Sequence, residues 1–425
     1  MSALSAENFP EAAVRERARS GTATVFPDVG GYGTTLFGAG PDDGADGIDA
    51  LRLVPPVFVP QRLEKLIDLA REPVYTDVGL DTAIGGFESR YPLYLSAFGS
   101  TQVASVDLGT AASRQAGRLG IPMVVGENVV PVNGYGRVER DGARSLLARI
   151  TGYAAELPDG CGGVVIQQST EDADAEVWNL VYSDPNTRPL LESGRLAFEL
   201  KVGQGAKPGL GGLTVLDAAG AGRLSEAFAM DPVFGEGSDR VLRCSSPGTF
   251  TEEILRQQIR LMRNNFPRAR VWVKLPPGRD VRPAAGIAWE AGAEAVTVDG
   301  AEGGTGWAPT AFLRHVGLPL AECLRRIGAH DSCLLVSGRM WEGARVAKCL
   351  ALGADAAGLG RAALLAVDED PEGGLVNLVE CLALELRMLT SALGKYHTGA
   401  LGRDDVWPLE PAPVPVPGLT GSRSS

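Results

Sequence analysis

The sequence predicts an α/β fold, a (β/α)8 TIM barrel with an N-terminal cap and a C-terminal helical extension. Eight short apolar runs recur along the chain, each bounded by glycine or proline. Segments with helical periodicity lie between several of these runs, and this alternation is typical of parallel α/β folds. The alternative is an open doubly wound sheet. No G-x-G-x-x-G motif opens the first βα unit, and eight strand candidates favour the closed barrel.

Each run is nearly continuous in apolar residues, as expected of parallel strands that are buried on both faces. In order, the runs are PLYLSAFGS (92–100), IPMVVGEN (121–128), GGVVIQQ (162–168), LAFELKVGQG (196–205), ARVWVKLPPG (269–278), AEAVTVDG (293–300), SCLLVSGR (332–339) and DAAGLGRA (355–362). Helical spacing precedes the second, fifth, sixth and eighth runs, at 111–120, 252–266, 284–293 and 340–354. Thr251, with Glu253 behind it, and Ser337 suit helix N-caps.

The flanking segments differ from the barrel in pattern. Residues 1–90 hold one helix signal, at 62–73, and are predicted to form a cap or arm packed on the barrel, which spans 91–367. Within 368–408, apolar residues at 375–394 recur at three- and four-residue steps, which predicts a helical extension. The proline-rich segment 409–425 is expected to be a flexible tail.

Composition excludes several classes of protein. The 425 residues carry a net charge of −12, which argues against a nucleic-acid partner or an anionic membrane surface. The chain has no run of about 18 apolar residues and begins without an apolar signal region, so we expect no membrane span. Six cysteines without C-x-x-C spacing and only three histidines predict neither a metal site nor an iron–sulfur cluster. Scattered reduced thiols indicate a cytoplasmic protein.

Polar and glycine residues end the later strands, where a barrel places its active site. Lys274 ends the fifth run, Ser337-Gly338-Arg339 end the seventh, and Gly358, Gly360 and Arg361 end the eighth. Backbone N–H groups at helix starts favour anions, and an arginine adds a forked donor. Together they predict a phosphate ligand. The alternative is that these glycines only make tight turns.

Several motifs resemble a known family. KVGQGAKPGLGG (201–212), VWVKLPP, VTVDGAEGGTGWAP, LLVSGR and ALGADAAGLGRAAL resemble the FMN-binding synthase domain of glutamate synthases, and also the stand-alone flavin subunit of methylamine–glutamate N-methyltransferase-type complexes. The resemblance covers about residues 90–395, and the QGAKPG run is its most specific part.

The resemblance implies an FMN on the C-terminal face of the barrel. Lys274 would lie near the N1–C2 edge of the flavin, and Ser96 and Ala97 would line the ring. The phosphate end would be held by Gly303, Gly304, Thr305, Ser337, Gly338, Arg339, Gly360 and Arg361. Gln204 and Lys207 would face the substrate, with Lys207 on a 2-oxo acid. Glu127 and Glu302, both at strand ends, are the candidate acid–base groups.

The chain also departs from the family pattern. Since about 90 residues precede the barrel in this sequence, we expect no amidotransferase domain before it. Cys381 alone stands where the family has three cysteines, so no iron–sulfur cluster is expected. Leu210 and Leu213 replace an acid and a glutamine, and Ala301-Glu302 replaces His-Asp. These changes argue against plain glutamate synthesis. Arg339 stands in place of a glycine, either to bind phosphate or as a surface cation.

The resulting prediction is a bacterial FMN-dependent oxidoreductase of amino acid metabolism, acting on an amino, imino or 2-oxo acid. Electrons would come from a diffusible reductant, a partner protein or the substrate. A partner could be an electron donor or an amidotransferase, and self-association fits exposed barrel helices. The alternatives are a non-net-redox flavoenzyme related to type 2 isoprenoid isomerases and a non-catalytic flavin subunit. A 2-hydroxyacid-oxidising barrel needs a His–Arg pair after the sixth strand, where this chain has no histidine.

Overall fold

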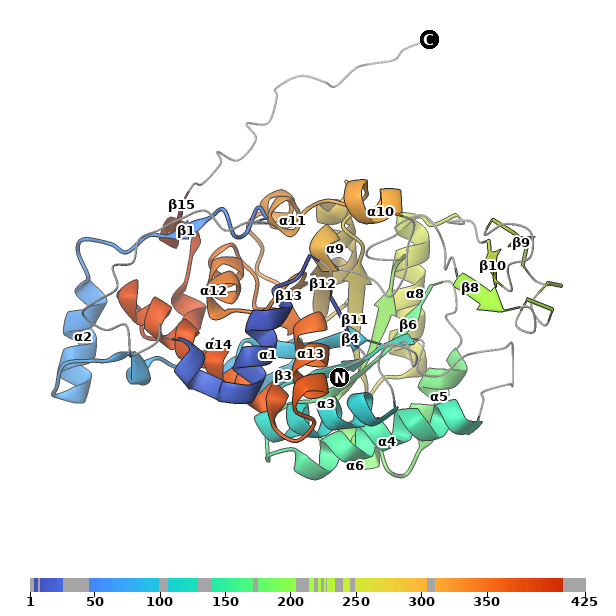
Figure 1. The fold of residues 1–425 in the computed structure, drawn as a ribbon, viewed down its shortest axis with the longest axis horizontal. Coiled ribbons are helices and arrows are strands. Elements are labelled where there is room, and N and C mark those ends of the chain that lie inside the picture. Colours follow the sequence, from blue (N-terminus) through green and yellow to red (C-terminus); the bar gives the residue numbers. More distant parts are fainter. Residues whose placement is uncertain are drawn as a thin grey trace, which may run out of the picture.

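The structure is a computed structural model that describes residues 4–6, 8–25, 46–98, 106–127, 140–170, 175–203, 214–217, 221–222, 225–226, 228–233, 240–244, 249–303 and 310–407. Its centre is a closed barrel of eight parallel strands (Figure 1), which confirms the predicted fold class. The strands, in barrel order, are β4 (Leu93–Phe98), β5 (Met123–Val125), β6 (Val164–Ser169), β7 (Leu196–Lys201), β11 (Arg270–Leu275), β12 (Ala295–Asp299), β13 (Leu334–Ser337) and β14 (Ala356–Leu359). All eight coincide with the predicted apolar runs, and β14 closes the barrel by pairing with β4.

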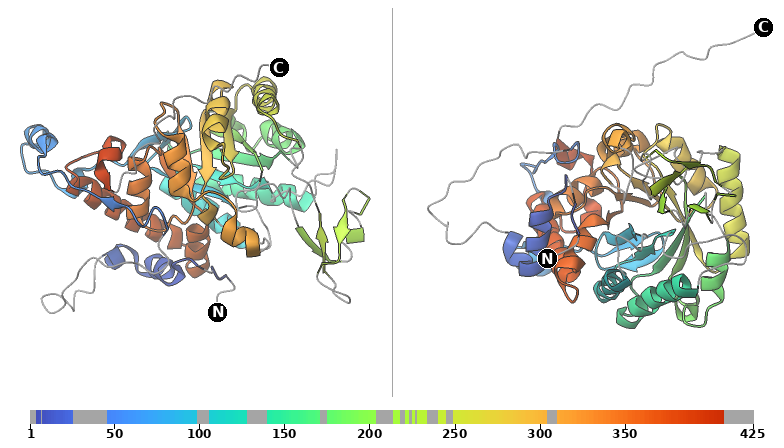
Figure 2. Two further views of the ribbon diagram at one scale, coloured as in Figure 1. Left: turned by 90° about the horizontal axis from the view of Figure 1, so that it is seen from above. Right: turned by 45° about the vertical axis from the view of Figure 1, so that its right-hand side comes forward.

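Helices surround the strands, as the right-hand view of Figure 2 shows. They are α3 (Val106–Leu119), α4 (Arg140–Glu156), α5 (Ala175–Ser183), α6 (Arg188–Glu192), α8 (Glu252–Asn265), α9 (Val281–Glu290), α10 (Thr310–His315), α11 (Leu320–Ile327), α12 (Gly343–Ala351), α13 (Arg361–Glu369) and α14 (Gly374–Ala392). The side chain of Thr251 accepts a hydrogen bond from Ile254 N at 3.3 Å and so caps α8, as predicted. The predicted capping role of Ser337 is wrong. This residue ends β13, and Glu342 takes the N-cap position of the next helix, α12.

The barrel interior changes from apolar to polar along the strands. Its floor takes one side chain from each strand and two from a hairpin, and consists of Tyr94, Val124, Val165, Ala197, Trp272, Ala295, Leu335 and Ala356 with Ile84 and Phe87. Side chains two positions further along a strand point to the same side. The next inward layer is therefore Ser96, Gln167, Glu199, Lys274, Thr297, Ser337 and Gly358, and its six side chains beyond glycine are all buried. A polar layer above an apolar floor places the chemistry at the carboxyl ends of the strands.

The N-terminal region contacts the barrel and the C-terminal segment at three places. Helix α1 (Glu11–Ser20) packs on α13 and α14. Strand β1 (Arg52–Leu53) pairs with β15 (Val406–Trp407). The hairpin of β2 (Thr82–Ile84) and β3 (Phe87–Ser89) closes the amino end of the barrel, where the Gly85 carbonyl accepts a hydrogen bond from Trp272 Nε1 at 3.1 Å. Helix α2 (Pro60–Leu69) projects from one end of the molecule (Figure 1).

A small sheet follows β7 that the sequence analysis did not anticipate. Strand β10 (Arg240–Arg243) pairs antiparallel with β8 (Thr214–Asp217) and with β9 (Met230–Asp231). Figure 1 shows this sheet at the end of the molecule opposite α2. Among the described residues, no helix is both long and apolar enough to span a bilayer.

Candidate functional site

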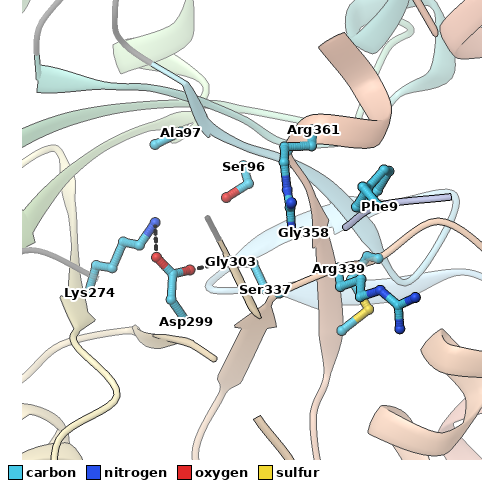
Figure 3. A pocket seen from close by; sticks show the side chains of 13 residues that line it. Phe9, Ser96, Ala97, Lys274, Asp299, Gly303, Ser337, Arg339, Gly358 and Arg361 are labelled. Atoms are coloured by element: carbon cyan, nitrogen blue, oxygen red, sulfur yellow. Dashed lines mark hydrogen bonds and ion pairs between the residues drawn. The ribbon is translucent and has the colours of Figure 1, made fainter. Parts of the chain in front are cut away.

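A cavity opens at the carboxyl ends of β4, β11, β12, β13 and β14 (Figure 3). Its lining consists of Phe9, Ser96, Ala97, Lys274, Asp299, Gly303, Ser337, Gly338, Arg339, Met340, Gly358, Gly360 and Arg361. Nine of these are residues that the sequence predicted as cofactor-binding, namely Ser96, Ala97, Lys274, Gly303, Ser337, Gly338, Arg339, Gly360 and Arg361. The barrel thus brings together predicted residues that lie far apart in sequence.

One end of the cavity holds a buried ion pair. Lys274 Nζ lies 2.9 Å from Asp299 Oδ2, and the Ser337 hydroxyl donates to the same carboxylate. Burial opposes the charge on Lys274, but Asp299 and Glu199 outweigh it and hold the pKa of the ammonium above its usual range. Asp299 was missed by the sequence analysis. Its signal was available, because it is the last polar residue of the sixth predicted strand.

Glu199 lies below this pair inside the barrel. Its carboxylate accepts hydrogen bonds from Gln167 Nε2 at 2.5 Å and from Thr297 Oγ1 at 3.0 Å. Burial raises its pKa, against the opposing effect of the Lys274 ammonium. A buried carboxyl group with a raised pKa beside a charged lysine is typical of a functional site.

The other end of the cavity is cationic. Arg361 Nη2 donates to the Glu302 carbonyl at 2.5 Å, and its guanidinium lies 4.5 Å from the ring centroid of Phe9. Burial and the nearby Arg339 lower the pKa of Arg361. Figure 3 shows Arg339, Arg361 and Phe9 on the side of the cavity away from Lys274 and Asp299. Two half-buried guanidinium groups on the same side of the cavity favour an anion there.

Arg339 occupies an unusual backbone position. Its φ is +56°, in the left-handed region that favours glycine. Its Nη1 pairs with Asp49, and the neighbouring Arg345 pairs with Asp46 at 2.8 Å. Arg339 Nε is buried and has no hydrogen-bond partner among the described residues. The segment from Asp46 to Asp49 thus fixes this arginine beside the cavity and leaves one buried donor to be satisfied.

Glycines make the remaining wall. Gly338 has φ of +138°, and a Cβ there would lie 3.3 Å from Gly300 N. A Cβ at Gly358 would lie 2.7 Å from the hydroxyl of Tyr94. A Cβ at Gly360 would meet no described atom within 4 Å, so this turn faces open space. Gly360 is also the N-cap of α13, and no side chain caps that helix. The start of α13 therefore presents its N–H groups to the cavity, a favourable arrangement for an anion.

The two predicted acid–base residues lie outside this lining. Glu127 pairs with Lys201 at 2.5 Å; burial opposes its ionisation, but Lys201 outweighs it and keeps the pKa low. The charge of Lys274 also acts on Glu127, so both belong to the same end of the barrel. Glu302 Oε2 accepts from Leu320 N at 3.0 Å at the start of α11, and burial raises its pKa. Their catalytic roles stay predictions.

Four predicted site residues fall outside the described part of the chain. They are Gln204, Lys207, Gly304 and Thr305. Gly203 and Gly303, which directly precede them, are described, and Gly303 lines the cavity.

The residues present fit a flavin mononucleotide. At one end of the cavity, the buried Lys274 ammonium suits the flavin ring. At the other end, the guanidinium groups of Arg339 and Arg361 and the uncapped start of α13 suit a phosphate. Arg339 Nε, which has no partner within the described part of the chain, is a donor that such a phosphate would satisfy.

Comparison with known proteins agrees with the motifs. Residues 189–370 match the conserved region in glutamate synthase. A glutamate synthase large subunit-like protein of Rhizobium meliloti is 31% identical over 302 residues, which cover 68% of this chain and 64% of that protein. An archaeal-type glutamate synthase [NADPH] of a Thermotoga species is 34% identical over 180 residues, which cover 40% of this chain and 34% of that one. The chain thus spans under two thirds of these relatives.

Solved structures share the fold. An oxidised active mutant of (S)-mandelate dehydrogenase superimposes with a TM-score of 0.56 at 17% identity and covers 94% of this chain and 99% of its own. A flavocytochrome b2 mutant with bound sulfite gives a TM-score of 0.52 at 16% identity, covering 84% of this chain and 76% of its own. At such identity the likeness concerns the barrel alone.

Fold and cavity together define a (β/α)8-barrel protein with a polar site at the carboxyl ends of its strands. The matched conserved region then places the chain among glutamate synthase-like proteins, as its motifs indicated.

Proposed function

We propose that the chain is an FMN-dependent oxidoreductase of the glutamate synthase-like type, acting on an amino, imino or 2-oxo acid. The observation that carries the proposal is a single cavity with Lys274 at one end and Arg339 and Arg361 at the other. A flavin mononucleotide needs this distribution of charge, because its reduced ring and its phosphate are both anionic. A bound flavin supplies hydride transfer, which no protein side chain provides.

The preference for a mononucleotide comes from Phe9. Its ring stands 4.5 Å from the Arg361 guanidinium and forms part of the cavity wall beside the proposed phosphate position. Helix α1, which follows Phe9, is held on the barrel by Arg15, whose Nη1 pairs with Asp368 at 2.9 Å. A dinucleotide would have to displace this segment, so FMN is favoured over FAD.

Each residue of the site then has a proposed role. Lys274, held by Asp299, stabilises negative charge at the ring end. Arg339, Arg361 and the start of α13 bind the phosphate. Glu127, kept ionised beside Lys201 at the same end of the barrel, is the candidate proton acceptor. Gln204 and Lys207, outside the described residues, are proposed to bind the carboxylate and carbonyl of the acid substrate, with Glu302 in a supporting acid–base role.

The first test is a visible spectrum of the purified protein, followed by anaerobic titration with NADPH, NADH and dithionite. Flavin absorbance that a nicotinamide donor bleaches would support the oxidoreductase and identify its reductant. Bleaching by dithionite alone would instead favour a protein electron donor or a reaction without net oxidation. If neither FMN nor FAD binds the apoprotein on reconstitution, the proposed function fails.

A further inference from the structure

The exposed apolar side chains of the described residues are concentrated in one region. Of twelve large hydrophobic residues that are exposed, seven lie within residues 54–75, the segment that contains α2, and an eighth, Trp407, lies on β15, which pairs with β1 just before that segment; we call these eight the arm patch. They are Val54, Val57, Phe58, Leu63, Ile67, Val74, Tyr75 and Trp407. Val57 is 88% exposed and Phe58 85%. Figures 1 and 2 show α2 projecting at the end of the molecule away from the β8–β10 sheet.

Helix α2 lacks an intramolecular core. None of its ten residues is buried, although Leu63 and Ile67 lie one turn apart on the same face. An isolated helix of this length is marginal in water, because most helical stability in proteins comes from packing an apolar face. The exposed stripe of α2 therefore requires a cover that one copy of the described chain does not provide.

A groove lies directly beside this helix. Its walls come from the N-terminal end of α2, from the segment that follows this helix and from the C-terminal part of α14, and it is lined by Val59, Arg62, Val74, Tyr75, Met388, Ser391, Ala392, Gly394 and Tyr396. Tyr75 and Val74 belong to both the groove and the arm patch. The surface thus presents a projecting apolar ridge next to an apolar-edged groove, which is the shape that a two-fold contact needs.

We propose that the arm patch is covered by a second copy of this chain, with α2 of each copy seated in the groove beside α2 of the other. The exposed area is sufficient. Since an aromatic side chain presents about 150–250 Å², Phe58, Tyr75 and Trp407 together expose roughly 300–450 Å². The five aliphatic members bring the patch close to the ~800 Å² per partner of a stable interface, above the 300–600 Å² typical of a monomer's largest patch.

Charge is compatible with a second copy and disfavours a strongly charged partner. The chain as a whole carries a net charge of −12, but residues 60–72 carry three basic and three acidic side chains, so the arm is locally neutral. Arg62 pairs with Glu72 at 2.6 Å and Arg71 with Asp77 at 2.6 Å, so these charges already match each other. An apolar surface with balanced charges can face its own copy without repulsion, whereas a strongly charged partner finds no opposite patch here.

Sedimentation velocity of the full chain between 1 and 100 µM, chosen to bracket ordinary dimer affinities, tests the proposal. We expect a dimer of twice the 44.5 kDa chain mass. Ile67→Asp and Phe58→Asp should weaken dimerisation about 100-fold or more, because they place a charge in a desolvated interface core. The matched control is Leu261→Asp on α8, at an exposed apolar site (58%) that is remote from the arm, and it should remain dimeric. A monomeric wild type, or a dimer that neither arm variant weakens, overturns the proposal.

Cross-linking identifies the occupant without a disruptive substitution. A photoreactive amino acid at Val57 is activated in a mixture of isotopically labelled and unlabelled chains, and the linked peptides are sequenced by mass spectrometry. Links between labelled and unlabelled copies, with residues 388–396 as acceptors, support the proposal. Links within one chain only, including links to 408–425, overturn it, because another segment then covers the patch. Flavin binding plays no part in either test, so the proposed function and this interface can fail independently.

Discussion

Lys274 is the residue on which the ring end of the cavity depends. It is buried and paired with Asp299, so Lys274→Met removes the one cation that lines this end of the described cavity. We predict at least a tenfold weaker retention of FMN and a lower reduction potential for the flavin that remains, since the anionic reduced ring loses its counter-charge. Lys395→Met, which removes the Lys395–Asp405 pair far from the cavity, is the matched control and should retain flavin. Equal potentials in both variants would contradict the assignment.

Glu199 leads to a prediction about pH. Burial raises the pKa of this carboxyl in the folded chain, so its contribution to stability is full below the ordinary carboxyl pKa and is lost as the pH rises through the raised value. Glu199→Gln cannot ionise. The melting temperature of the variant minus that of the wild type should therefore grow as the pH is raised from about 5 towards 9. Parallel melting curves would show that Glu199 carries no such linkage.

A substitution of Arg339 tests its role in phosphate binding separately from its backbone strain. Its left-handed conformation costs an ordinary residue about 1–2 kcal/mol, which Arg339→Gly would recover while losing the ion pair with Asp49. Stability should therefore change little, but FMN affinity should fall about tenfold because a phosphate donor is lost. Riboflavin, which has no phosphate, is the internal control and should bind equally to both proteins. An equal loss for both ligands in isothermal titration would place Arg339 away from the phosphate.

At the scale of elements, the β2–β3 hairpin closes the barrel floor. Phe87 is 1% exposed and lies 5.5 Å from the ring of Trp272, so Phe87→Ala leaves a cavity under the strands. We predict a loss of about 3–5 kcal/mol in the free energy of unfolding. Phe250→Ala, at a 38% exposed site, should cost far less in the same denaturant titration. Because the hairpin lies at the amino end, FMN affinity of folded Phe87→Ala should stay within about twofold, well under one tenfold step of 1.4 kcal/mol.

Local sequence patterns predicted some of these elements and missed others. All eight strands were predicted because a strand buried on both faces must be apolar along its whole length. The same reading missed the β8–β10 sheet, whose strands are short and only partly buried where described, so they carry no such run. It also gave Ser337 a capping role, since a serine before a helix pattern has the same local signal whether or not a turn intervenes.

For the whole molecule, the cavity joins β4, β11, β12, β13, β14 and the segment before α1, so a ligand there ties distant parts of the chain together. Binding to the folded state alone stabilises it by mass action, about 2.7 kcal/mol when the ligand is at 100 times its Kd. FMN should therefore raise the melting temperature of the apoprotein, and riboflavin should raise it less at the same concentration. Equal shifts for the two flavins would argue against a phosphate site at Arg339 and Arg361.

The sequence alone determined the barrel, because strand periodicity and glycine-bounded turns are local properties of the chain. It also identified most of the cavity lining, since strand ends in a barrel must converge. Only the tertiary structure decided which groups touch. It selected Asp299 as the partner of Lys274, paired Glu127 with Lys201, and brought Phe9 onto Arg361. These contacts depend on strand register and on packing between segments hundreds of residues apart. Local sequence patterns predict neither the register nor this packing.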